Sequence, residues 1–356
     1  MVTDTATSPD PTSASPGDPA SIRSAIATQD GLLVLSRAEI ARLLSFGDYV
    51  DAVEAALCAA AAGRAVAPPA SALHVADGSF HAKAGALIDD SGTIVAIKLN
   101  GNFPGNPAAH QLPTVQGVIY LADGGNGRPL ALMDSIEITI NRTGAATTLA
   151  ARHLARADSR VATICGAGVQ GRIQAVAIAA AAKLERMHVW DARPEAATAL
   201  AADLACDLRL DVRASGDLAP VRDSDIVVTC TSARQAFLTQ DLVKPGTFIA
   251  AVGADNADKQ EVDPALFACA RVVVDSLEQC AEIGDLHHAL AAGAIARDGV
   301  HASLAEIVAG KKPGRRGARE ITLFDSTGLG LQDVAAAYAL YRRALALGSG
   351  KRVAVH

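Results

Sequence analysis

The sequence predicts an α/β fold in which a doubly wound parallel sheet is inserted in a second α/β domain. Three observations indicate this fold. First, β-prone runs and helical runs alternate from residue 161 to residue 275, the order found in parallel sheets with helices on both faces. Second, a glycine-rich turn follows the first of these strands. Third, strand and helix runs of a separate unit precede the series, and an Ala-rich helix over residues 331–347 is expected to return to that unit.

The composition favours a two-domain protein that binds small molecules. With 356 residues, of which 50% are hydrophobic, the chain is long enough for two cores. The net charge of −6 gives no general attraction for nucleic acid or for an anionic membrane. No apolar run approaches the ~20 residues needed to cross a bilayer. The six cysteines form no CxxC pair, which fits reduced thiols in a cytoplasmic protein.

Residues 1–28 are expected to form a disordered leader. Pro9, Pro11, Pro16 and Pro19 stand there among Ser, Thr and Asp residues. The segment has neither the basic start nor the apolar stretch of a secretory signal, which also favours the cytoplasm.

The first domain is expected to begin with a strand over residues 32–35. Ser36 and Glu39 then form the pattern of a capping box, and apolar residues at helical spacing over 40–62 predict one or two helices that stop before Gly63. An extended segment over 64–74 leads to strands over 79–87 and 93–100, which a turn joins. A strand over 116–122 follows, and residues 129–134 then lead into a helix that begins near residue 136 and ends near residue 157.

Three cations are expected on one face of this sheet. His81 and Lys83 lie two residues apart, so they share a strand face, and Lys98 lies near the end of the partner strand. A charge on the inner face of a sheet is costly unless something pairs with it. A bound carboxylate is one candidate for that pairing, and the alternative is a sheet edge with snorkelling lysines.

The most informative motif is the turn that contains Gly166, Gly168 and Gly171, between a strand over 161–165 and a helix over 172–182. In such a turn the first glycine allows the sharp bend, the second lets the backbone approach a pyrophosphate, and the third lets the helix lie close to the strand. The phosphates bind at the helix N-terminus, where free N–H groups favour anions. The pattern predicts a Rossmann-type dinucleotide site, and the alternative is a glycine turn that binds nothing.

Asp191 bears on the choice of cofactor. It follows a strand over 187–190 and lies 20 residues after Gly171, where a carboxylate accepts hydrogen bonds from the adenosine ribose. Because a carboxylate there repels the extra phosphate of NADP, NAD is the expected cofactor. Arg193 could cover such a phosphate and keeps NADP possible, unless it is a solvated residue at the start of the next helix.

The parallel sheet is expected to continue through a helix over 194–206, a strand over 211–212, a helix over 216–221 and strands over 225–230, 247–252 and 271–275. Ligands bind at the C-terminal ends of such strands, which makes Thr231, Asp255 and Lys259 candidates. One more strand, within 320–328, precedes the final helix. The expected parts are therefore a domain made of 29–144 and 323–356, and a Rossmann domain made of 145–322.

Five segments of the chain occur in one order in a known family: Lys98-Leu-Asn-Gly-Asn, Asn141-Arg142-Thr143-Gly-Ala-Ala, Gly166-Ala-Gly-Val-Gln170-Gly, Ala251-Val-Gly-Ala-Asp255-Asn-Ala-Asp-Lys259-Gln-Glu261 and Asp325-Ser326-Thr327-Gly. On these segments the chain resembles the ornithine cyclodeaminase/μ-crystallin family, from about Leu32 to Tyr341. Members are homodimeric NAD(P)-dependent enzymes that make or reduce a C=N bond at the α-carbon of an amino acid. The resemblance therefore implies that the first domain binds substrate and forms the dimer.

By this resemblance, Lys98 would hold the substrate carboxylate and Asp255 would be the acid/base beside the reacting nitrogen. Hydride transfer to an imine agrees with these roles, because one cation must fix the carboxylate and one carboxylate must serve the nitrogen. The resemblance adds Thr327 as a residue that faces the substrate, and we also expect His81, Lys83 and Arg142 to contact the substrate. Besides the glycine turn and Arg193, the residues that line the cofactor would be Thr114, Arg142, Val169, Gln170, Asp191, Thr231, Lys259 and Ser326.

The chain also departs from the family pattern. Ornithine cyclodeaminases place a glutamate on the strand where this chain has Phe80-His81-Ala-Lys83, and an arginine that helps to grip the carboxylate is missing near Ala70, although Arg64 is close by. A site with three cations repels a second ammonium on the substrate. The sequence therefore favours an imino acid that is neutral or carries an additional carboxylate over ornithine.

Three hypotheses follow. The leading one is an NAD(P)-dependent imino acid reductase or amino acid dehydrogenase. The second is a lyase of the ornithine cyclodeaminase type, which releases ammonia and recycles NAD, and the third is a non-enzymatic binding protein like the μ-crystallins. No metal is expected, because Asp285, His287, His288 and His301 show no recognised ligand spacing and fit a helix end.

Overall fold

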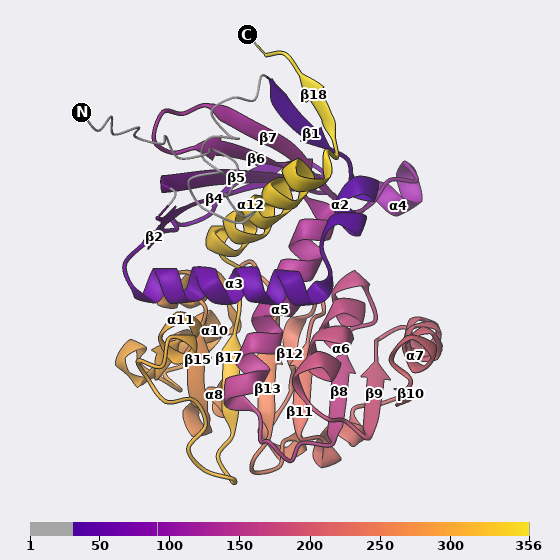
Figure 1. The fold of residues 1–356 in the computed structure, drawn as a ribbon. Coiled ribbons are helices and arrows are strands. Elements are labelled where there is room, and N and C mark those ends of the chain that lie inside the picture. Colours follow the sequence, from indigo (N-terminus) through magenta and orange to yellow (C-terminus); the bar gives the residue numbers. More distant parts are fainter. Residues whose placement is uncertain (1–30, 91, 356) are drawn as a thin grey trace, which may run out of the picture.

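The computed structural model describes residues 31–90 and 92–355, so the leader expected over 1–28 lies outside the described residues. The chain folds into two parts, which stand one above the other in Figure 1. Each part is built on its own eight-stranded sheet, called here the upper and the lower sheet. Within the described ranges, none of the helices combines the length and the apolar character that a bilayer crossing requires.

The lower sheet is parallel throughout. Its strands are β8 (Val161–Cys165), β9 (Arg186–Trp190), β10 (Asp211–Ser215), β11 (Ile226–Thr229), β13 (Phe248–Ala251), β15 (Arg271–Val274), β16 (Ala302–Ser303) and β17 (Thr322–Asp325). They lie in the order β10-β9-β8-β11-β13-β17-β15-β16, and every pair is parallel.

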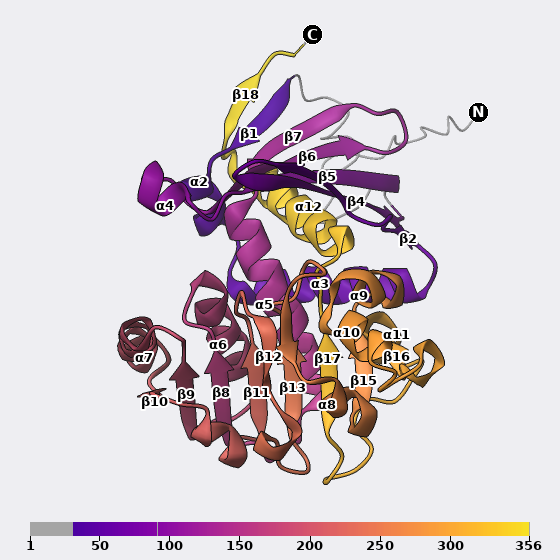
Figure 2. The same ribbon diagram turned by 180° about the vertical axis from the view of Figure 1, so that it is seen from behind.

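Helices cover both faces of the lower sheet, as the sequence predicted. Ile226 and Val228 of β11 pack into one hydrophobic cluster with α5 (Ile136–Leu154) and α6 (Val169–Ala181). Val227 points the other way, into a cluster with α8 (Pro264–Cys269) and α10 (Asp285–Ala291). Figures 1 and 2 show these two faces from opposite sides. The predicted doubly wound sheet is therefore confirmed.

The upper sheet is mostly antiparallel. Its strands are β1 (Leu32–Leu35), β2 (Ala65–Val66), β3 (Ser71–Val75), β4 (Gly78–Asp89), β5 (Gly92–Asn102), β6 (Val115–Asp123), β7 (Pro129–Asp134) and β18 (Lys351–Val353). Only the β1–β7 pair is parallel. The long helix α12 (Gly330–Leu347) lies against one face (Figure 1). Along β5, Ala96 and Lys98 are buried on that face, whereas Ile97 and Leu99 on the other face are exposed.

Most predicted elements are present, with small differences. The capping box of Ser36 and Glu39 begins α2 (Arg37–Leu43), and a second box, of Ser45 and Asp48, begins α3 (Phe46–Ala61). The prediction of a helix over 216–221 is wrong. That region holds a short 3-10 turn, Ala219–Asp223, because Pro220 lacks a backbone donor and the Asp217 carboxylate accepts the N–H of Ala219.

The chain crosses between the two parts at places that differ from the expected boundaries. Helix α5 runs from the upper part down into the lower one (Figure 1), so the boundary expected at 144/145 falls inside a helix. Strand β17 is hydrogen-bonded between β13 and β15, and its four residues are buried, as in the middle of a parallel sheet. The second crossing therefore follows Asp325 instead of falling at 323.

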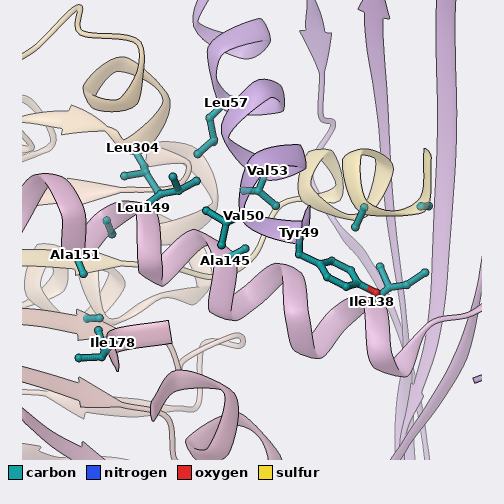
Figure 3. Close-up of a cluster of buried hydrophobic side chains, with 14 of the residues drawn as sticks. Tyr49, Val50, Val53, Leu57, Ile138, Ala145, Leu149, Ala151, Ile178 and Leu304 are labelled. Atoms are coloured by element: carbon teal, nitrogen blue, oxygen red, sulfur yellow. The ribbon is translucent and has the colours of Figure 1, made fainter. Parts of the chain in front are cut away.

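Helix α3 packs against α5 where the two parts meet. Val50, Val53 and Leu57 on α3 face Ala145 and Leu149 on α5 (Figure 3), and all five side chains are buried. The small alanine allows the two helix backbones to approach closely. This contact fixes the upper part on the lower one, and so it fixes the relative positions of the residues that each part contributes to a common site.

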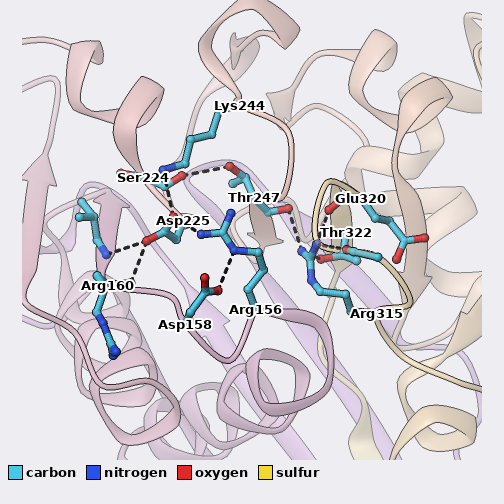
Figure 4. Close-up of polar contacts among 12 residues, drawn as sticks. Arg156, Asp158, Arg160, Ser224, Asp225, Lys244, Thr247, Arg315, Glu320 and Thr322 are labelled. Carbon is cyan, nitrogen blue, oxygen red and sulfur yellow. Dashed lines mark hydrogen bonds and ion pairs between the residues drawn. The ribbon is translucent and has the colours of Figure 1, made fainter.

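Asp225 stabilises the end of the lower sheet at which strands β8 and β11 begin. Its buried carboxylate accepts hydrogen bonds from the backbone N–H groups of Arg160 (2.7 Å) and Val161 (3.1 Å), and it pairs with Arg156 (3.0 Å) and Lys244 (2.9 Å), as Figure 4 shows in part. Burial alone would raise its pKa, but these donors outweigh burial and lower the pKa. The stability that this carboxylate contributes is therefore present at neutral pH and is lost as the pH falls through the acid range.

We expect Asp225→Ala to lower the free energy of unfolding by about 3 kcal/mol, because it leaves two partly buried cations and two backbone N–H groups without their partner. Urea denaturation measures this loss. Asp158→Ala is the matched control: Asp158 also pairs with Arg156 but its side chain is 77% exposed, so the expected change is below about 1 kcal/mol. Equal losses in the two variants would contradict the structural role given to Asp225.

Candidate active site

The glycine turn leaves the start of α6 open for an anion. Gly166, directly after β8, has a φ of +118°, which disfavours any residue with a side chain. A Cβ on Gly171 would lie 1.9 Å from the carbonyl oxygen of Gly166, so only glycine fits there. At Gly168 no protein atom lies near the position of a Cβ, and no side chain caps the helix. The first N–H groups of α6 are thus available to phosphate oxygens.

Asp191 is held directly beside this turn. It follows β9, and its two carboxylate oxygens accept the N–H groups of Ala167 (2.7 Å) and Arg193 (2.9 Å). The side chain of Arg193 is 69% exposed, and its Nε lies 3.7 Å from Asp191. The carboxylate therefore has the position that the spacing predicted, and its orientation is fixed before any ligand binds.

A cavity of about 910 Å³ extends from Asp191 to Asp255 and Lys259. Nine of the residues predicted to contact a cofactor line it: Thr114, Gly166, Gly168, Val169, Gln170, Asp191, Arg193, Thr231 and Lys259. Gly171 does not line it, in keeping with its packing role. Arg142 and Ser326 do not line it either, so their assignment to the cofactor stays a prediction, and both are buried.

Several residues of the cavity wall were not predicted. Phe237, on β12 (Arg234–Leu238), stands beside Trp190 with 5.3 Å between ring centroids, and the pair forms an aromatic wall near Asp191. Arg37 reaches the cavity from the upper part and pairs with Glu137 at 2.7 Å. No sequence signal marks Phe237 or Arg37, because each arrives from a distant part of the chain.

Glu261 is a further residue that the sequence did not reveal. It lies on β14 (Gln260–Val262) and is fully buried. Its carboxylate accepts hydrogen bonds from the Thr231 hydroxyl (2.7 Å) and the Gly253 N–H (2.9 Å), and so it ties together the loops that follow β11 and β13. Burial and the neighbouring Asp285 raise the pKa of Glu261 to about 7.

The three predicted cations share the inner face of the upper sheet. In the β4–β5 register Lys83 stands opposite Lys98, and His81 stands opposite Asn100. Lys98 is only 3% exposed, and its Nζ lies 2.7 Å from Asp333 of α12. These side chains point into the protein, so the alternative of an exposed sheet edge with snorkelling lysines is wrong for Lys98.

Arg142 joins this cluster from α5. Its Nε lies 3.1 Å from the second oxygen of Asp333, and its terminal nitrogen donates to Gln332 (2.8 Å). The location beside Lys98 favours the substrate role predicted for Arg142 over the cofactor role. Asp333 and Gln332 were not predicted, because neither belongs to a motif and both meet Arg142 only through the fold.

The charges shift the acid–base behaviour of the lysines. Burial, Arg142 and Lys83 together lower the pKa of Lys98 to about 7, against the opposing pull of Asp333. Burial also lowers the pKa of Lys83, and Arg142 adds to this effect. Lys98 therefore changes charge near neutral pH.

Lys83 on β4 contacts the backbone of the residues that follow β17. The ammonium of Lys83 donates to the carbonyl oxygens of Thr327 and Gly328, each at 2.8 Å. The hydroxyl of Thr327 instead donates to Asp275 (3.2 Å) and accepts from Gln279 (2.7 Å). Thr327 therefore lies next to the cationic cluster, but its backbone, not its hydroxyl, makes the contact.

Asp255 faces the cations from the lower part. It lies in the loop after β13, its side chain is 52% exposed, and it pairs with Lys259 at 2.7 Å. Partial desolvation inside the cavity opposes its ionisation, but Lys259, Lys83 and His81 outweigh this effect and lower its pKa. Lys83 is within electrostatic range of both Asp255 and Arg142, so the predicted carboxylate lies near the predicted cations, although only Asp255 lines the cavity.

The histidines near α10 have protein partners. His288 contacts the carbonyl oxygen of Lys259 at 2.9 Å, and His287 contacts that of Ala281 at 3.3 Å. Across residues 31–90 and 92–355 there is no group of three acidic, histidine or cysteine side chains with the geometry of a metal site.

A parallel sheet with a glycine turn, an uncapped helix start and an acid after the second strand defines a Rossmann-type dinucleotide-binding protein, here with a cationic pocket from a second domain. The chain belongs to the ornithine cyclodeaminase/mu-crystallin family, whose model matches residues 32–348. The resemblance seen in the sequence is thereby confirmed.

Three relatives cover almost the whole chain. The iminosuccinate reductase of Paracoccus denitrificans is 35% identical over 326 residues, which are 91% of this chain and 100% of that protein. The Thermococcus litoralis Delta(1)-pyrroline-2-carboxylate reductase, solved with NADH and L-proline, is 35% identical with a TM-score of 0.86, and the match covers 90% of this chain and 100% of that one. An archaeal alanine dehydrogenase dimer with bound NAD is 35% identical with a TM-score of 0.87, and covers 91% and 99%.

We expect Gly168→Ala to block dinucleotide binding without harming the fold. The backbone of Gly168 is extended and its Cβ position is open, so the free energy of unfolding should change by less than about 0.5 kcal/mol. The added methyl group would occupy the space into which a pyrophosphate must come, and NADH affinity should fall at least about tenfold. Quenching of Trp190, the only tryptophan, reports NADH binding. Gly216→Ala, also in open space, is the control, and an unchanged affinity in Gly168→Ala would refute the location of the phosphates.

Proposed function

We propose that the protein is an NAD-dependent oxidoreductase that reduces the C=N bond of an α-imino acid, or oxidises the amino acid in the reverse direction. The observation that carries this proposal is that Asp255, which lines the dinucleotide cavity, lies within electrostatic range of Lys83, which belongs to the cationic cluster of Lys83, Lys98 and Arg142. The names of the relatives support it, since they are imino acid reductases and an alanine dehydrogenase.

The cavity fits NAD by its size and by its donors. The open N–H groups after Gly168 would hold the pyrophosphate, Asp191 the adenosine ribose, and Trp190 with Phe237 would border the adenine. Thr231 and Lys259, which also line the cavity, would border the nicotinamide end. When bound, NADH supplies the hydride. Asp191 favours NAD, and the exposed Arg193 leaves NADP possible as a second cofactor.

The residues of the chain supply position and charge. Lys98 and Arg142 would bind the α-carboxylate and so orient the α-carbon. Asp255, whose low pKa keeps it ionised, would stabilise the protonated imine during reduction and take a proton from the ammonium during oxidation. Its pairing with Lys259 fixes the carboxylate before the substrate arrives.

Asp255→Asn should lower kcat by about 10²- to 10⁴-fold and leave NADH affinity within about twofold of wild type, because Asn keeps the shape but has neither the charge nor the basicity. Steady-state kinetics with oxaloacetate or pyruvate plus ammonia, read at the nicotinamide band, give kcat, and Trp190 quenching gives the affinity.

Asp258→Asn is the control in the same loop, since Asp258 is exposed and its side chain makes no hydrogen bond to any residue that the structure describes; its backbone N–H donates to Asn256. If Asp255→Asn lost NADH binding and turnover equally, Asp255 would have no part in the chemistry.

Lys83 indicates the class of substrate within this proposal. Among the described residues no carboxylate lies within 4 Å of its ammonium, which is held only by two carbonyl oxygens. A half-buried cation without a counter-ion in contact is costly unless a ligand supplies one. We therefore propose that the substrate carries a second carboxylate, as iminosuccinate does. A diamino acid would put an ammonium beside Lys83, which disfavours the cyclodeaminase reaction.

Lys83→Met should raise KM for the imine of oxaloacetate by roughly 10- to 100-fold and leave KM for the imine of pyruvate nearly unchanged. The ratio of kcat/KM for the two keto acids with ammonia measures this difference. Lys83→Arg keeps the charge and should retain most of the preference. A ratio that does not move in Lys83→Met would exclude a second carboxylate at Lys83.

The proposal also includes the assembly and location of the protein. The outer face of the upper sheet exposes Ile97, Leu99 and Val118, which sit on adjacent strands, and such an apolar face favours a homodimer. A monomer in analytical ultracentrifugation would contradict it.

All six cysteines are free thiols, which supports a cytoplasmic location. The partners are small amino or imino acids, with no membrane and no nucleic acid. The intact Lys98, Arg142 and Asp255 disfavour a purely non-enzymatic role.

A further inference from the structure

Asp333 joins the two cations that are proposed to bind the substrate carboxylate. Its oxygens lie 2.7 Å from Lys98 and 3.1 Å from Arg142, and its side chain is 1% exposed. Among the described residues no other carboxylate lies within ion-pair distance of either cation. The proposed reaction does not use Asp333, so its place at the centre of this cluster needs a separate explanation.

A close contact between the first turn of α12 and strand β4 places Asp333 under the upper sheet. Helix α12 begins at Gly330, where a Cβ would lie 2.1 Å from the carbonyl oxygen of Ala84 on β4. Across from it, a Cβ on Gly85 would lie 3.0 Å from the Gly330 backbone. The two glycines thus let the first turn of α12 touch the strand that carries Lys83. Asp333 is in that first turn, where the helix dipole also favours a negative charge.

The cations would repel one another without this carboxylate. Lys83 stands directly opposite Lys98 on the neighbouring strand, and like charges in such a pair are destabilising. Arg142 approaches Lys98 from α5 and is always charged. The group that can give up its charge is Lys98. Its pKa is lowered to about 7 by burial, Arg142 and Lys83, and Asp333 is the carboxylate that opposes this shift.

We propose that Asp333 is a positioning residue that keeps Lys98 protonated and holds Arg142 in place, so that the pair is ready to receive a carboxylate. The proposal rests on the proposed function only in taking Lys98 and Arg142 as the carboxylate site. Two simpler roles are opposed to it. In the first, Asp333 only stabilises the fold. In the second, Asp333 competes with the substrate carboxylate for Lys98 and Arg142, so that the substrate must displace it.

These roles predict different pH dependences. Lys98 binds a carboxylate only as the ammonium, so affinity is full below its pKa and is lost as the pH rises through it. Removing Asp333 lowers that pKa further, and the loss should then begin at a lower pH. A purely structural role would weaken binding by the same factor at every pH, and a competitor role would make the variant bind more tightly.

The experiment measures the binding of oxalate, a small dianion that stays ionised across the range, to the protein saturated with NAD. Titration calorimetry from about pH 6 to about pH 9 covers the transition of Lys98. In the wild type the affinity should fall above about pH 7. In Asp333→Asn the fall should begin at least about one pH unit lower, so that oxalate binds about tenfold or more weakly at about pH 8 and recovers toward the wild-type affinity in acid.

Two controls accompany the variant. Asp333→Glu keeps the charge and should keep a pH profile close to the wild type, and Asp241→Asn makes the same chemical change at an exposed residue that pairs with Arg222. The proposal is overturned by a constant ratio of affinities between Asp333→Asn and wild type, by tighter binding in Asp333→Asn, or by a wild-type affinity that does not fall between about pH 6 and pH 9. The oxalate assay measures binding alone. If the protein reduced no imine, the proposed function would be wrong, but the pH dependence of oxalate binding would still test the role of Asp333.

Discussion

The structure depends on one electrostatic constraint: Lys83, Lys98 and Arg142 are gathered on the inner side of the upper sheet, and among the described residues Asp333 is the one carboxylate in direct contact with any of them. Burying charges of one sign costs several kcal/mol unless partners compensate them. One directly paired carboxylate does not neutralise three cations, and Asp255 and Asp275 act on Lys83 only over a longer distance, so the cluster keeps an excess of positive charge at contact range. An anionic ligand removes that excess, and this requirement selects carboxylate substrates before any shape complementarity is considered.

The fold provides this pocket by crossing twice between two domains. Helix α5 carries Arg142 out of the upper part, and the segment after β17 carries Thr327, Gly328 and Asp333 back to it. The glycine turn after β8 and the loop with Asp255 come from the lower sheet. The cationic cluster therefore comes from the upper part and the dinucleotide cavity mainly from the lower part, and neither part alone contains all the residues of the proposed site.

The sequence predicted the parts of this arrangement that have a local signal. Alternating strands and helices indicated the parallel sheet, glycine spacing indicated the turn at Gly166, and the two-residue period placed His81 and Lys83 on one face. The salt bridge between Lys98 and Asp333 joins residues far apart in the chain, and no periodicity points to it. Arg37 and Phe237 were missed for the same reason. The domain boundary near β17 was misplaced because the sequence of a short buried strand does not show which of the two sheets the strand joins.

A crystal structure of the protein with NADH and L-aspartate tests the central claim most directly. The account predicts the α-carboxylate between Lys98 and Arg142, the second carboxylate at Lys83, and the amino group toward Asp255, with the nicotinamide C4 about 3–3.5 Å from the α-carbon. An amino acid bound elsewhere, or a nicotinamide ring that faces away from Asp255, would contradict it.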